Sequence, residues 1–508
     1  MTAATLVQRR LSTRPDPCVL YAALGPGPDT ALFEGMAGPS LLMRHAAVRA
    51  ECRGEQVTMR ALSANGASLL GRLRGTLPHA IAGADELTLS VHIPRSRSLD
   101  AEQRLLAPSP LHAIRGLLRA ALPETQEPFA AVVLGVVAFD YAAAGEDLPD
   151  NPEDPLGFPD FVFWVPESLV LFEPGLVPRI LCAAFDDPDP RRTARNHHDA
   201  VARLATIAEA CERAPIVAPS ARPAVVAVDA EADLDDAAYM AVVRRLKGEI
   251  AAGEVYQIVP SRTFRIACPQ PLRAFEALRQ VEPHSYRFFV QGADFTLLGA
   301  SPETSVRLFK EDGMNIVEVR PIAGTRPRGR TGDEDDRLES ELRLDEKELA
   351  EHMMLVDLAR NDVARISVAG TRRVAKLMSV ERYARVMHLV SSVTGHLRAG
   401  LDAFDALAAC LNVGTLTGAP KIRAMQLLRE TERTRRGPYG GAVGWINGAG
   451  GMDTAVVIRS AVVRDGVAYV RAGAGVVHDS DPQAEADETR RKASALLSVL
   501  AAVPEEAR

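Results

Sequence analysis

Two pairs of glutamates have a spacing that could bind a divalent metal ion. Glu348 and Glu351 lie three residues apart in the stretch 344–362, whose apolar residues recur at helical spacing. Glu485 and Glu488 repeat the pattern near the C-terminus. Carboxylates three apart project from one side of a helix, and oxygen ligands without Cys or His partners suit Mg²⁺. If the two helices converge, four carboxylates surround one point; the simpler interpretation is two solvated acid pairs.

Two glycine-containing turns could hold an anion. Gly324 and Thr325 follow a predicted strand in an arginine-rich turn, where backbone N–H groups and a hydroxyl could face an anion. An exposed basic loop is the simpler interpretation of that turn. Gly473 and Gly475 end another strand and would let a ligand approach the backbone closely. This second turn lacks the third glycine and the following helix of a dinucleotide fingerprint, which argues against a Rossmann-type oxidoreductase.

Composition limits the class of protein. The 508 residues are 47% hydrophobic and 25% charged, which is typical of a globular chain with roughly three domain-equivalents. The net charge of -7 argues against binding to nucleic acid, and we find neither a secretory signal nor a membrane span. The cysteines lack paired spacing, so we expect no disulfide framework and no zinc site, and a cytoplasmic location. They are Cys18, Cys52, Cys182, Cys211, Cys268 and Cys410.

Hydrophobic patterns predict an α+β fold. Strands are predicted over 56–62, 87–93, 130–141, 161–172, 179–185, 254–266, 286–291, 295–300, 305–308, 315–320, 440–446, 454–463 and 467–472. Helices are predicted over 67–77, 110–121, 193–214, 235–252 and 344–362, and another begins with Asp481 as N-cap and Pro482 in its first turn. Strands and helices do not alternate strictly, which favours large antiparallel sheets. A Pro-rich linker at 214–223 predicts a division into 1–223 and 224–508.

Eight segments of the second half resemble, in order, the chorismate-utilising enzymes, and among them the large subunit (component I) of anthranilate synthase. The segments are 253–262, 298–303, 321–329, 344–362, 386–390, 414–421, 439–441 and 485–488. The first half resembles the N-terminal region of that family more weakly, best at 57–66. The resemblance implies a chorismate-binding fold whose large antiparallel sheets pack face to face and are flanked by helices, with 224–508 as the catalytic domain.

The resemblance also implies a reaction. A nucleophile adds at C2 of chorismate while the C4 hydroxyl leaves, and Mg²⁺ meets the charge on the ring carboxylate. Glu351 and Glu488 are implied as direct metal ligands, with Glu348 and Glu485 holding metal-bound waters. Glu303 is implied as the general acid for the leaving hydroxyl, a role that needs a raised pKa.

Other matching positions are implied to bind the substrate. His388 matches a histidine near the departing group and the C2 proton; a lone histidine in this apolar context is otherwise a core residue. Gly324 and Thr325 are implied at the ring carboxylate. The clamp on the enolpyruvyl carboxylate, together with the remaining substrate contacts, is implied to consist of Tyr439, Arg459, Gly473, Ala474, Gly475, Thr415 and Lys492.

Two positions bear on the nucleophile. Gln257 stands where isochorismate and salicylate synthases carry a lysine that deprotonates water, and ammonia needs no such base. Ala323 stands where aminodeoxychorismate synthases carry a lysine that redirects ammonia to C4. The expected product is 2-amino-2-deoxyisochorismate (ADIC), and loss of pyruvate from it would give anthranilate. An ADIC synthase of secondary metabolism, which stops before pyruvate release, and a non-catalytic chorismate-binding paralogue remain as alternatives.

The sequence also leads us to expect a partner and an altered effector region. No cysteine lies in a Gly-x-Cys-x-Gly turn, so ammonia should come from a separate glutamine amidotransferase subunit, and we expect a homo- or hetero-oligomer. Tryptophan-regulated relatives carry a Leu-Leu-Glu-Ser segment, which we expect to be missing between 31–35 and 40–45. Arg287 replaces a methionine of the effector pocket, where an unpaired buried charge would be costly. We therefore expect weak or no inhibition by tryptophan.

Overall fold

The computed structural model describes residues 4–35, 38–76, 81–96, 98, 100–151, 153–214, 228–283, 286–383 and 386–502. Two large antiparallel sheets form its centre and share strands β3 (Ser40–Arg53) and β8 (Phe161–Phe172). These two strands pair along their length, with register shifts between Met43 and Val48. Shifts of this kind bend a strand pair, so each strand has different neighbours on either side of the bend.

The first sheet contains the C-terminal half of β3 and the N-terminal half of β8. Its order is β5, β6, β4, β3, β8, β7, β21, β22, β15, β16, β19 and β18, and β17 continues the line of β16 along β19. The bounds are β4 Gln56–Ala61, β5 Ile81–Ala84, β6 Thr88–His92, β7 Val132–Val137, β15 Thr304–Glu311, β16 Met314–Val319, β17 Ile322–Pro327, β18 Arg373–Arg382, β19 Val386–His396, β21 Ala442–Asn447 and β22 Met452–Val456.

The second sheet contains the other halves of β3 and β8. Its order is β1, β9, β8, β3, β2, β13, β14, β23, β24, β12 and β10. The bounds are β1 Ala4–Arg10, β2 Thr30–Glu34, β9 Arg179–Phe185, β10 Glu231–Ala232, β12 Ser261–Ala267, β13 Tyr286–Gln291, β14 Thr296–Ser301, β23 Ser460–Arg464 and β24 Val467–Gly473.

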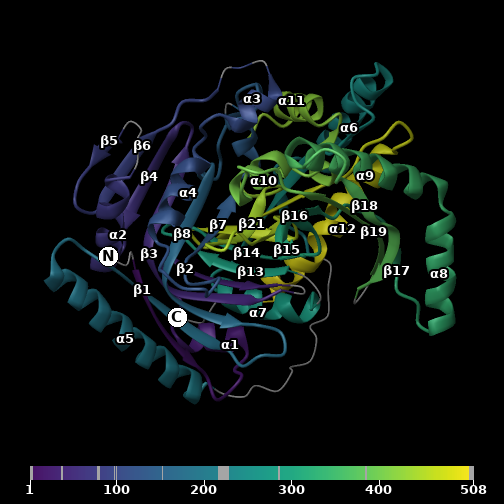
Figure 1. Cartoon of the computed structure of the whole chain (residues 1–508). Coiled ribbons are helices and arrows are strands. Elements are labelled where there is room, and N and C mark those ends of the chain that lie inside the picture. Colours follow the sequence, from purple (N-terminus) through teal and green to yellow (C-terminus); the bar gives the residue numbers. More distant parts are fainter. Residues whose placement is uncertain are drawn as a thin grey trace.

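The sheets pack face to face, and helices cover their outer faces. Trp164, Phe288, Leu297 and Val443 belong to the apolar core between the sheets. A second core joins the first sheet to α2 (Ala64–Arg74), α4 (Leu111–Ala120), α9 (Glu346–Ile366) and α10 (Ala403–Cys410). A third joins the second sheet to α1 (Pro17–Ala23), α5 (Pro190–Arg213), α7 (Pro271–Val281) and α12 (Pro482–Ala501). The predicted α+β fold with facing sheets is confirmed (Figure 1).

Shorter elements complete the chain around these layers. Helices α6 (Asp236–Ala251) and α11 (Lys421–Glu432) pack together near the two-stranded sheet of β11 (Gln257–Ile258) and β20 (Gly418–Ala419). The remaining helices are α3 (Ala101–Leu106), α8 (Gly332–Leu344), and the 3₁₀ helices η1 (Phe139–Ala144) and η2 (Gly414–Leu416). Helix α8 stands at the edge of the molecule beyond β17 (Figure 1).

Three predicted strands are wrong where the chain changes direction. The strand predicted over 454–463 is two strands, because the chain breaks between Val456 and Ser460 and Arg459 has a φ of 50°. The strand predicted over 130–141 ends at Val137 and continues as η1. The strand predicted over 254–266 is divided into β11 and β12. Hydrophobic runs alone do not show these interruptions, because buried residues lie on both sides of each break and burial continues across it.

The predicted division at 223 lies within residues that are not described, as does the predicted linker apart from Ala214. Strands from the two parts pair directly, β2 with β13 and β7 with β21, so the sheets are continuous across that division. The division into two domains stays a prediction. All six cysteines are free and buried. Among the described helices, none combines the length and the apolar character that a membrane span requires.

Candidate active site

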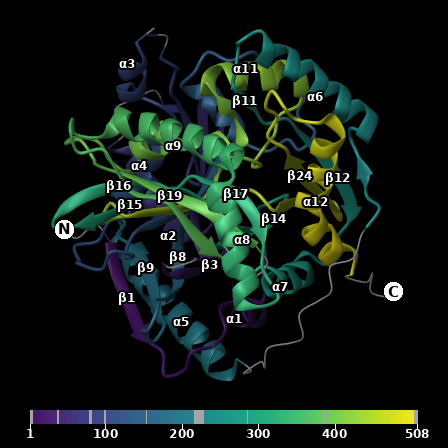
Figure 2. The ribbon, with the colours of Figure 1, turned by 90° about the vertical axis from the view of Figure 1, so that its right-hand side faces the viewer.

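The first glutamate of each pair, Glu348 or Glu485, lies in the first turn of its helix, and the second, Glu351 or Glu488, lies one turn further along. Asp345 caps α9 by accepting hydrogen bonds from the N–H groups of Lys347 and Glu348. Asp481 caps α12 by accepting from Ala484, and Pro482 occupies the first turn, so both predictions are confirmed. In Figure 2, α9 and α12 lie on either side of β17 and β24. Capping therefore positions both pairs at helix N-termini, where the macrodipole favours negative charge.

The charges of the two pairs influence one another. Burial raises the pKa of Glu351, and the carboxylates of Glu348 and Glu485 raise it further. The positive charge of Lys347 opposes this and lowers the pKa. Burial also raises the pKa of Glu485, and Glu488 adds to that rise. The N-terminal parts of α9 and α12 are therefore close enough for carboxylates of one helix to act on those of the other. Among the described residues, however, no three His, Cys, Asp or Glu side chains are grouped closely enough to form a metal site.

Nearby cations hold three of the four carboxylates. Glu348 Oε1 accepts from Arg326 Nη1 at 3.3 Å, and Lys347 Nζ lies 3.9 Å from Glu351 Oε1. Glu488 lies 2.6 Å from Arg491 Nη2 and 3.5 Å from Lys492 Nζ. These contacts point carboxylates toward basic side chains instead of toward one another. The donor set nonetheless suits Mg²⁺, because it consists of carboxylate oxygens crowded by like charge.

Glu303 has the environment of a general acid. It lies in the turn between β14 and β15 and is only 5% exposed. Thr415 Oγ1, in η2, donates a 2.8 Å hydrogen bond to Glu303 Oε1. Burial raises the pKa of Glu303 to about 8, although this hydrogen bond and the positive charge of Lys492 each lower it. At neutral pH the carboxyl is therefore protonated and able to donate a proton.

A bulge in β17 joins His388 to the first glutamate pair. The register of β17 against β19 shifts between Ala323 and Thr325, where Gly324 has a φ of 75°. A Cβ atom on Gly324 would lie 3.4 Å from Glu348 Oε2, so the bulge packs against α9. His388 Nδ1 lies 3.1 Å from the Gly324 carbonyl and 3.0 Å from Thr325 Oγ1. Ala323 pairs with the residue after His388.

The hydrogen bond of His388 fixes its tautomer. A carbonyl oxygen can only accept, so Nδ1 carries the proton in the bond to Gly324 and Nε2 carries the lone pair. Burial lowers the pKa of His388 to about 4, and the charges of Arg459 and Lys492 lower it further. His388 is therefore neutral at physiological pH and can accept a proton at Nε2.

Arg459, Lys492 and the end of β24 form a basic clamp. Lys492 Nζ donates to the Gly473 carbonyl at 3.0 Å, and Arg459 Nη1 contacts the Lys492 carbonyl at 3.3 Å. A Cβ atom on Gly473 would lie 3.1 Å from the Tyr439 hydroxyl, which only glycine avoids. Buried Ala474 follows, its N–H bonded to the carbonyl of Pro260. This arrangement suits a carboxylate.

Gln257 completes the site on the side of Gly475. A Cβ atom on Gly475 would lie 2.9 Å from Gln257 Nε2, so this glycine makes room for the amide. Gln257 is buried, and its Oε1 has no hydrogen-bond partner among the described residues. An acceptor in that state can receive a hydrogen bond from a small molecule at low cost.

The structure brings the predicted residues into one connected site. Lys492 acts electrostatically on Glu303, His388 and Glu485, which come from three separate segments. Thr415 is bonded to Glu303, and Gly324 adjoins Glu348. Gln257 is joined to this network through Gly475.

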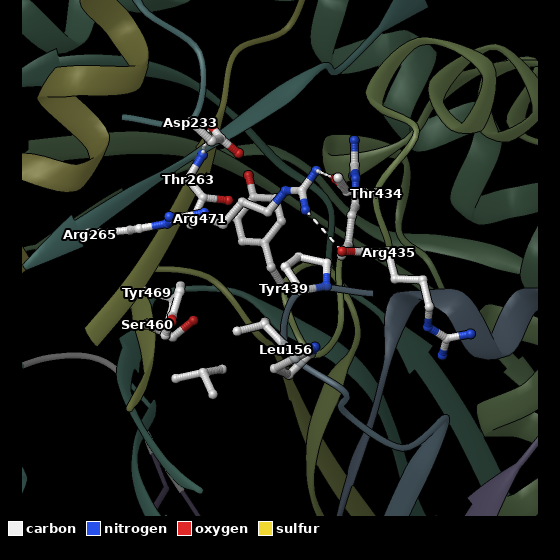
Figure 3. Close-up of a pocket in the computed structure, with 14 residues that line it drawn as sticks. Leu156, Asp233, Thr263, Arg265, Thr434, Arg435, Tyr439, Ser460, Tyr469 and Arg471 are labelled. Carbon is white, nitrogen blue, oxygen red and sulfur yellow. Dashed lines mark hydrogen bonds between the residues drawn. The ribbon is translucent and has the colours of Figure 1, made fainter. Parts of the chain in front are cut away.

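An ion cluster beside Tyr439 was not predicted from the sequence. Buried Glu432 accepts from Arg436 Nη2 at 2.7 Å and from Arg471 Nη2 at 2.9 Å. Arg436 also lies over the Tyr439 ring, 5.8 Å from its centroid. Figure 3 shows Arg471 beside Tyr439 and Thr434 in a cavity of about 30 Å³. The spacing of Glu432 and Arg436, four apart, was the available signal, but a solvated helix pair has the same spacing.

The expectation that Arg287 is unpaired is wrong. Arg287 Nε lies 3.2 Å from Glu34 Oε2, and Arg279 Nη2 lies 2.7 Å from Glu34 Oε1. β2 carries Glu34 directly opposite Arg287 on β13. The cavity that adjoins this ion pair has a volume of about 20 Å³, which is space for about one water molecule.

Comparison with known proteins identifies relatives. A profile of the family described as chorismate binding enzyme matches residues 82–498. The Vibrio cholerae protein named anthranilate synthase component 1 is 46% identical over 502 residues, 96% of this chain and 94% of that protein. The Pseudomonas aeruginosa protein named anthranilate synthase component 1, pyocyanine specific, is 45% identical over 92% of this chain and 88% of its own length. The crystal structure of anthranilate synthase component I from Streptococcus pneumoniae TIGR4 has a TM-score of 0.67 at 30% identity, covering 91% of this chain and 93% of that one.

Proposed function

This chain belongs to the family of chorismate binding enzymes, and we propose that it aminates chorismate with ammonia as component I of an anthranilate synthase. The observation that carries this proposal is buried Glu303, whose pKa is raised to about 8 and which is bonded to Thr415. The C4–O bond of chorismate breaks as ammonia forms the new C2–N bond. Glu303 gives its proton to the leaving hydroxyl, and water departs. Loss of one proton from the new ammonium group gives the neutral amino group of ADIC, whose two carboxylates stay charged.

We propose that the acid cluster binds Mg²⁺. Glu351 and Glu488 would ligate the ion directly, and Glu348 and Glu485 would hold its waters, as the resemblance implies. Support comes from Glu351, whose pKa is raised by burial and by two neighbouring carboxylates that a dication would offset. The ion would supply a positive charge for the ring carboxylate.

Gln257 and His388 would act after the substrate is bound. The free Oε1 of Gln257 can accept a hydrogen bond from ammonia and orient its lone pair toward C2. His388 Nε2 can accept the C2 proton as the C3–O bond breaks, which leaves the aromatic ring of anthranilate. The departing enolpyruvate takes up one proton and becomes pyruvate. Arg459 and Lys492 would hold the enolpyruvyl carboxylate during both steps.

The ammonia would come from a separate glutamine amidotransferase subunit. A glutaminase needs a reactive cysteine, and burial raises the pKa of each of the six thiols of this chain. We also propose that tryptophan does not inhibit this enzyme, because the Glu34–Arg287 ion pair adjoins a cavity with space for about one water molecule.

A second candidate is an ADIC synthase that stops before pyruvate release. It is favoured by the lack of room for tryptophan and by the similarity to a relative named pyocyanine specific. Sequence identity does not discriminate between the two candidate functions, since the two relatives are 46% and 45% identical to this chain.

Mass spectrometry of the product tests the proposal. The purified chain is incubated with chorismate, MgCl₂ and an ammonium salt, and anthranilate with pyruvate is the expected product. ADIC without pyruvate would support the second candidate instead. Glu303→Gln should lower kcat by about 10²- to 10⁴-fold while the protein stays folded. If the wild-type chain consumes no chorismate under these conditions, it is a non-catalytic member of the family.

A further inference from the structure

A cavity of about 430 Å³ lies outside the proposed active site. Its walls come from α3, α4 and η1 on one side and from α9, α10 and α11 on the other. The labels of α3, α10 and α11 mark this region in the upper part of Figure 1. Its volume falls within the range of small-molecule sites, which are typically about 300–1,000 Å³. No step of the proposed reaction uses it.

One cation on its wall lacks a close partner. Glu146, Asp362 and Asp405 are the acids of the wall, and each is bonded to another cation: Arg104 at 2.9 Å, Lys421 at 2.7 Å and Arg115 at 2.7 Å, respectively. Among the described residues, the one ion pair of Arg365 is with Glu146, at 3.8 Å. The wall therefore carries one guanidinium more than its acids neutralise.

Arg365 and Asn361 face the cavity together. They lie four residues apart on α9, so they share one face of the helix, and both line the cavity. Neither side chain makes a hydrogen bond to any residue that the structure describes. A guanidinium and an amide on adjacent turns can donate together to the two oxygens of a carboxylate.

Much of the remaining wall is apolar and includes two aromatic rings. Phe404 is 3% exposed and Tyr141 is 6% exposed, and Met425 and Leu411 extend the same surface. Rings of this kind favour stacked or edge-on contact with another ring. We propose that this cavity is a second binding site, which takes a small aromatic monocarboxylate with its carboxylate on Arg365 and Asn361.

The second site is coupled to Glu303 through a short segment. Asp362 lines this cavity and also a cavity of about 20 Å³ beside Glu303 and Thr415. The Leu411 carbonyl accepts from Lys421 Nζ at 3.4 Å, and four residues later Thr415 donates to Glu303. A ligand that contacts Leu411 and Lys421 therefore shifts this segment and alters the hydrogen bond between Thr415 and Glu303. Binding does not depend on the proposed function, but this effect on turnover does.

Isothermal titration of the full-length chain with benzoate tests the site. Benzoate should bind, and Arg459→Gln should leave this binding intact because Arg459 belongs to the active-site clamp. Arg365→Gln should weaken it by about ten- to a hundredfold, the usual loss for a hydrogen bond to a charged group. Arg360→Gln is the matched control, since Arg360 lies on α9 outside the cavity wall and pairs with Asp357 at 3.0 Å.

A second variant keeps the test independent of charge. Ala408 is exposed at the cavity wall, so Ala408→Phe should fill the cavity and abolish benzoate binding without disturbing the core. The proposal is overturned if benzoate does not bind, or if its binding is lost in Arg459→Gln and unchanged in Arg365→Gln and Ala408→Phe.

Turnover tests the coupling separately. Benzoate should inhibit ammonium-dependent chorismate consumption without competing with chorismate, and Arg365→Gln should abolish this inhibition. Competitive inhibition that persists in Arg365→Gln would overturn the coupling. If the chain consumes no chorismate at all, the proposed function fails, while the binding titration still decides whether the site exists.

Discussion

At the scale of single residues, the raised pKa of Glu303 makes stability depend on pH. The ordinary value is 4.5 and burial raises it to about 8, so between these values the unfolded chain releases a proton that the folded chain keeps. The contribution of this carboxyl to stability is therefore fully present below 4.5 and is lost as pH rises through about 8. Glu303→Gln, which is neutral at every pH, should gain in Tm over the wild type across this window.

Thermal unfolding followed by circular dichroism at several pH values measures that gain. Glu311→Gln, at the exposed end of β15, the strand that follows Glu303, is the control and should show a difference that does not grow with pH. A constant Tm difference between Glu303→Gln and the wild type would contradict the raised pKa.

The acid cluster predicts opposite effects on activity and stability. Glu351→Gln and Glu488→Gln should each abolish turnover, because each removes a proposed metal ligand. Glu351→Gln should also raise the Tm in metal-free buffer, because its half-buried carboxylate lies near like charges. Asp487→Asn, at an exposed position beside Glu488 on α12, is the matched control. Near-wild-type turnover of Glu488→Gln at millimolar Mg²⁺ would refute the assignment of this ligand.

At the scale of elements, the bulge of β17 should be sensitive to one methyl group. Gly324 has a φ of 75°, and a Cβ atom would lie 3.1 Å from Leu389 and 3.2 Å from Leu342. Gly324→Ala should therefore cost about 1–3 kcal/mol of stability and displace the carbonyl that holds His388. Urea unfolding and kcat measure the two effects. Gly332→Ala is the control, because a Cβ there meets nothing within 4 Å, and equal behaviour of both variants would contradict this account.

The elements also show what the sequence alone could predict. Strands with clear patterns and turns at both ends, such as β8 and β9, match their predicted bounds. Both proposed metal-binding helices were predicted because caps and helical spacing are local signals. The break before Arg459 and the bulge at Gly324 were not predicted, because pairing with distant strands imposes them. The same limit hid Arg365 and Asn361, whose surroundings come from distant parts of the chain.

At the scale of the whole molecule, the chain should use ammonia but not glutamine. All six cysteines are buried among packed elements, so none can attack glutamine. Chorismate consumption should proceed with an ammonium salt and should be absent with glutamine until an amidotransferase subunit is added. Glutamine-dependent turnover by the purified single chain would refute this expectation.

The continuity of the two sheets also bears on regulation by tryptophan. β2 from the first part of the chain and β13 from the second bring Glu34 and Arg287 together, and the adjoining cavity measures about 20 Å³. An inhibitor acts at a distance only if it binds two states of the protein differently, and here its site would require breaking a half-buried ion pair. Ammonia-dependent turnover should therefore stay unchanged at millimolar tryptophan. Arg287→Met removes the ion pair, so inhibition of this variant alone would identify the pair as the cause of insensitivity. Half-inhibition of the wild type at micromolar tryptophan would contradict the proposal, because the indole would then have found a site beside an intact ion pair.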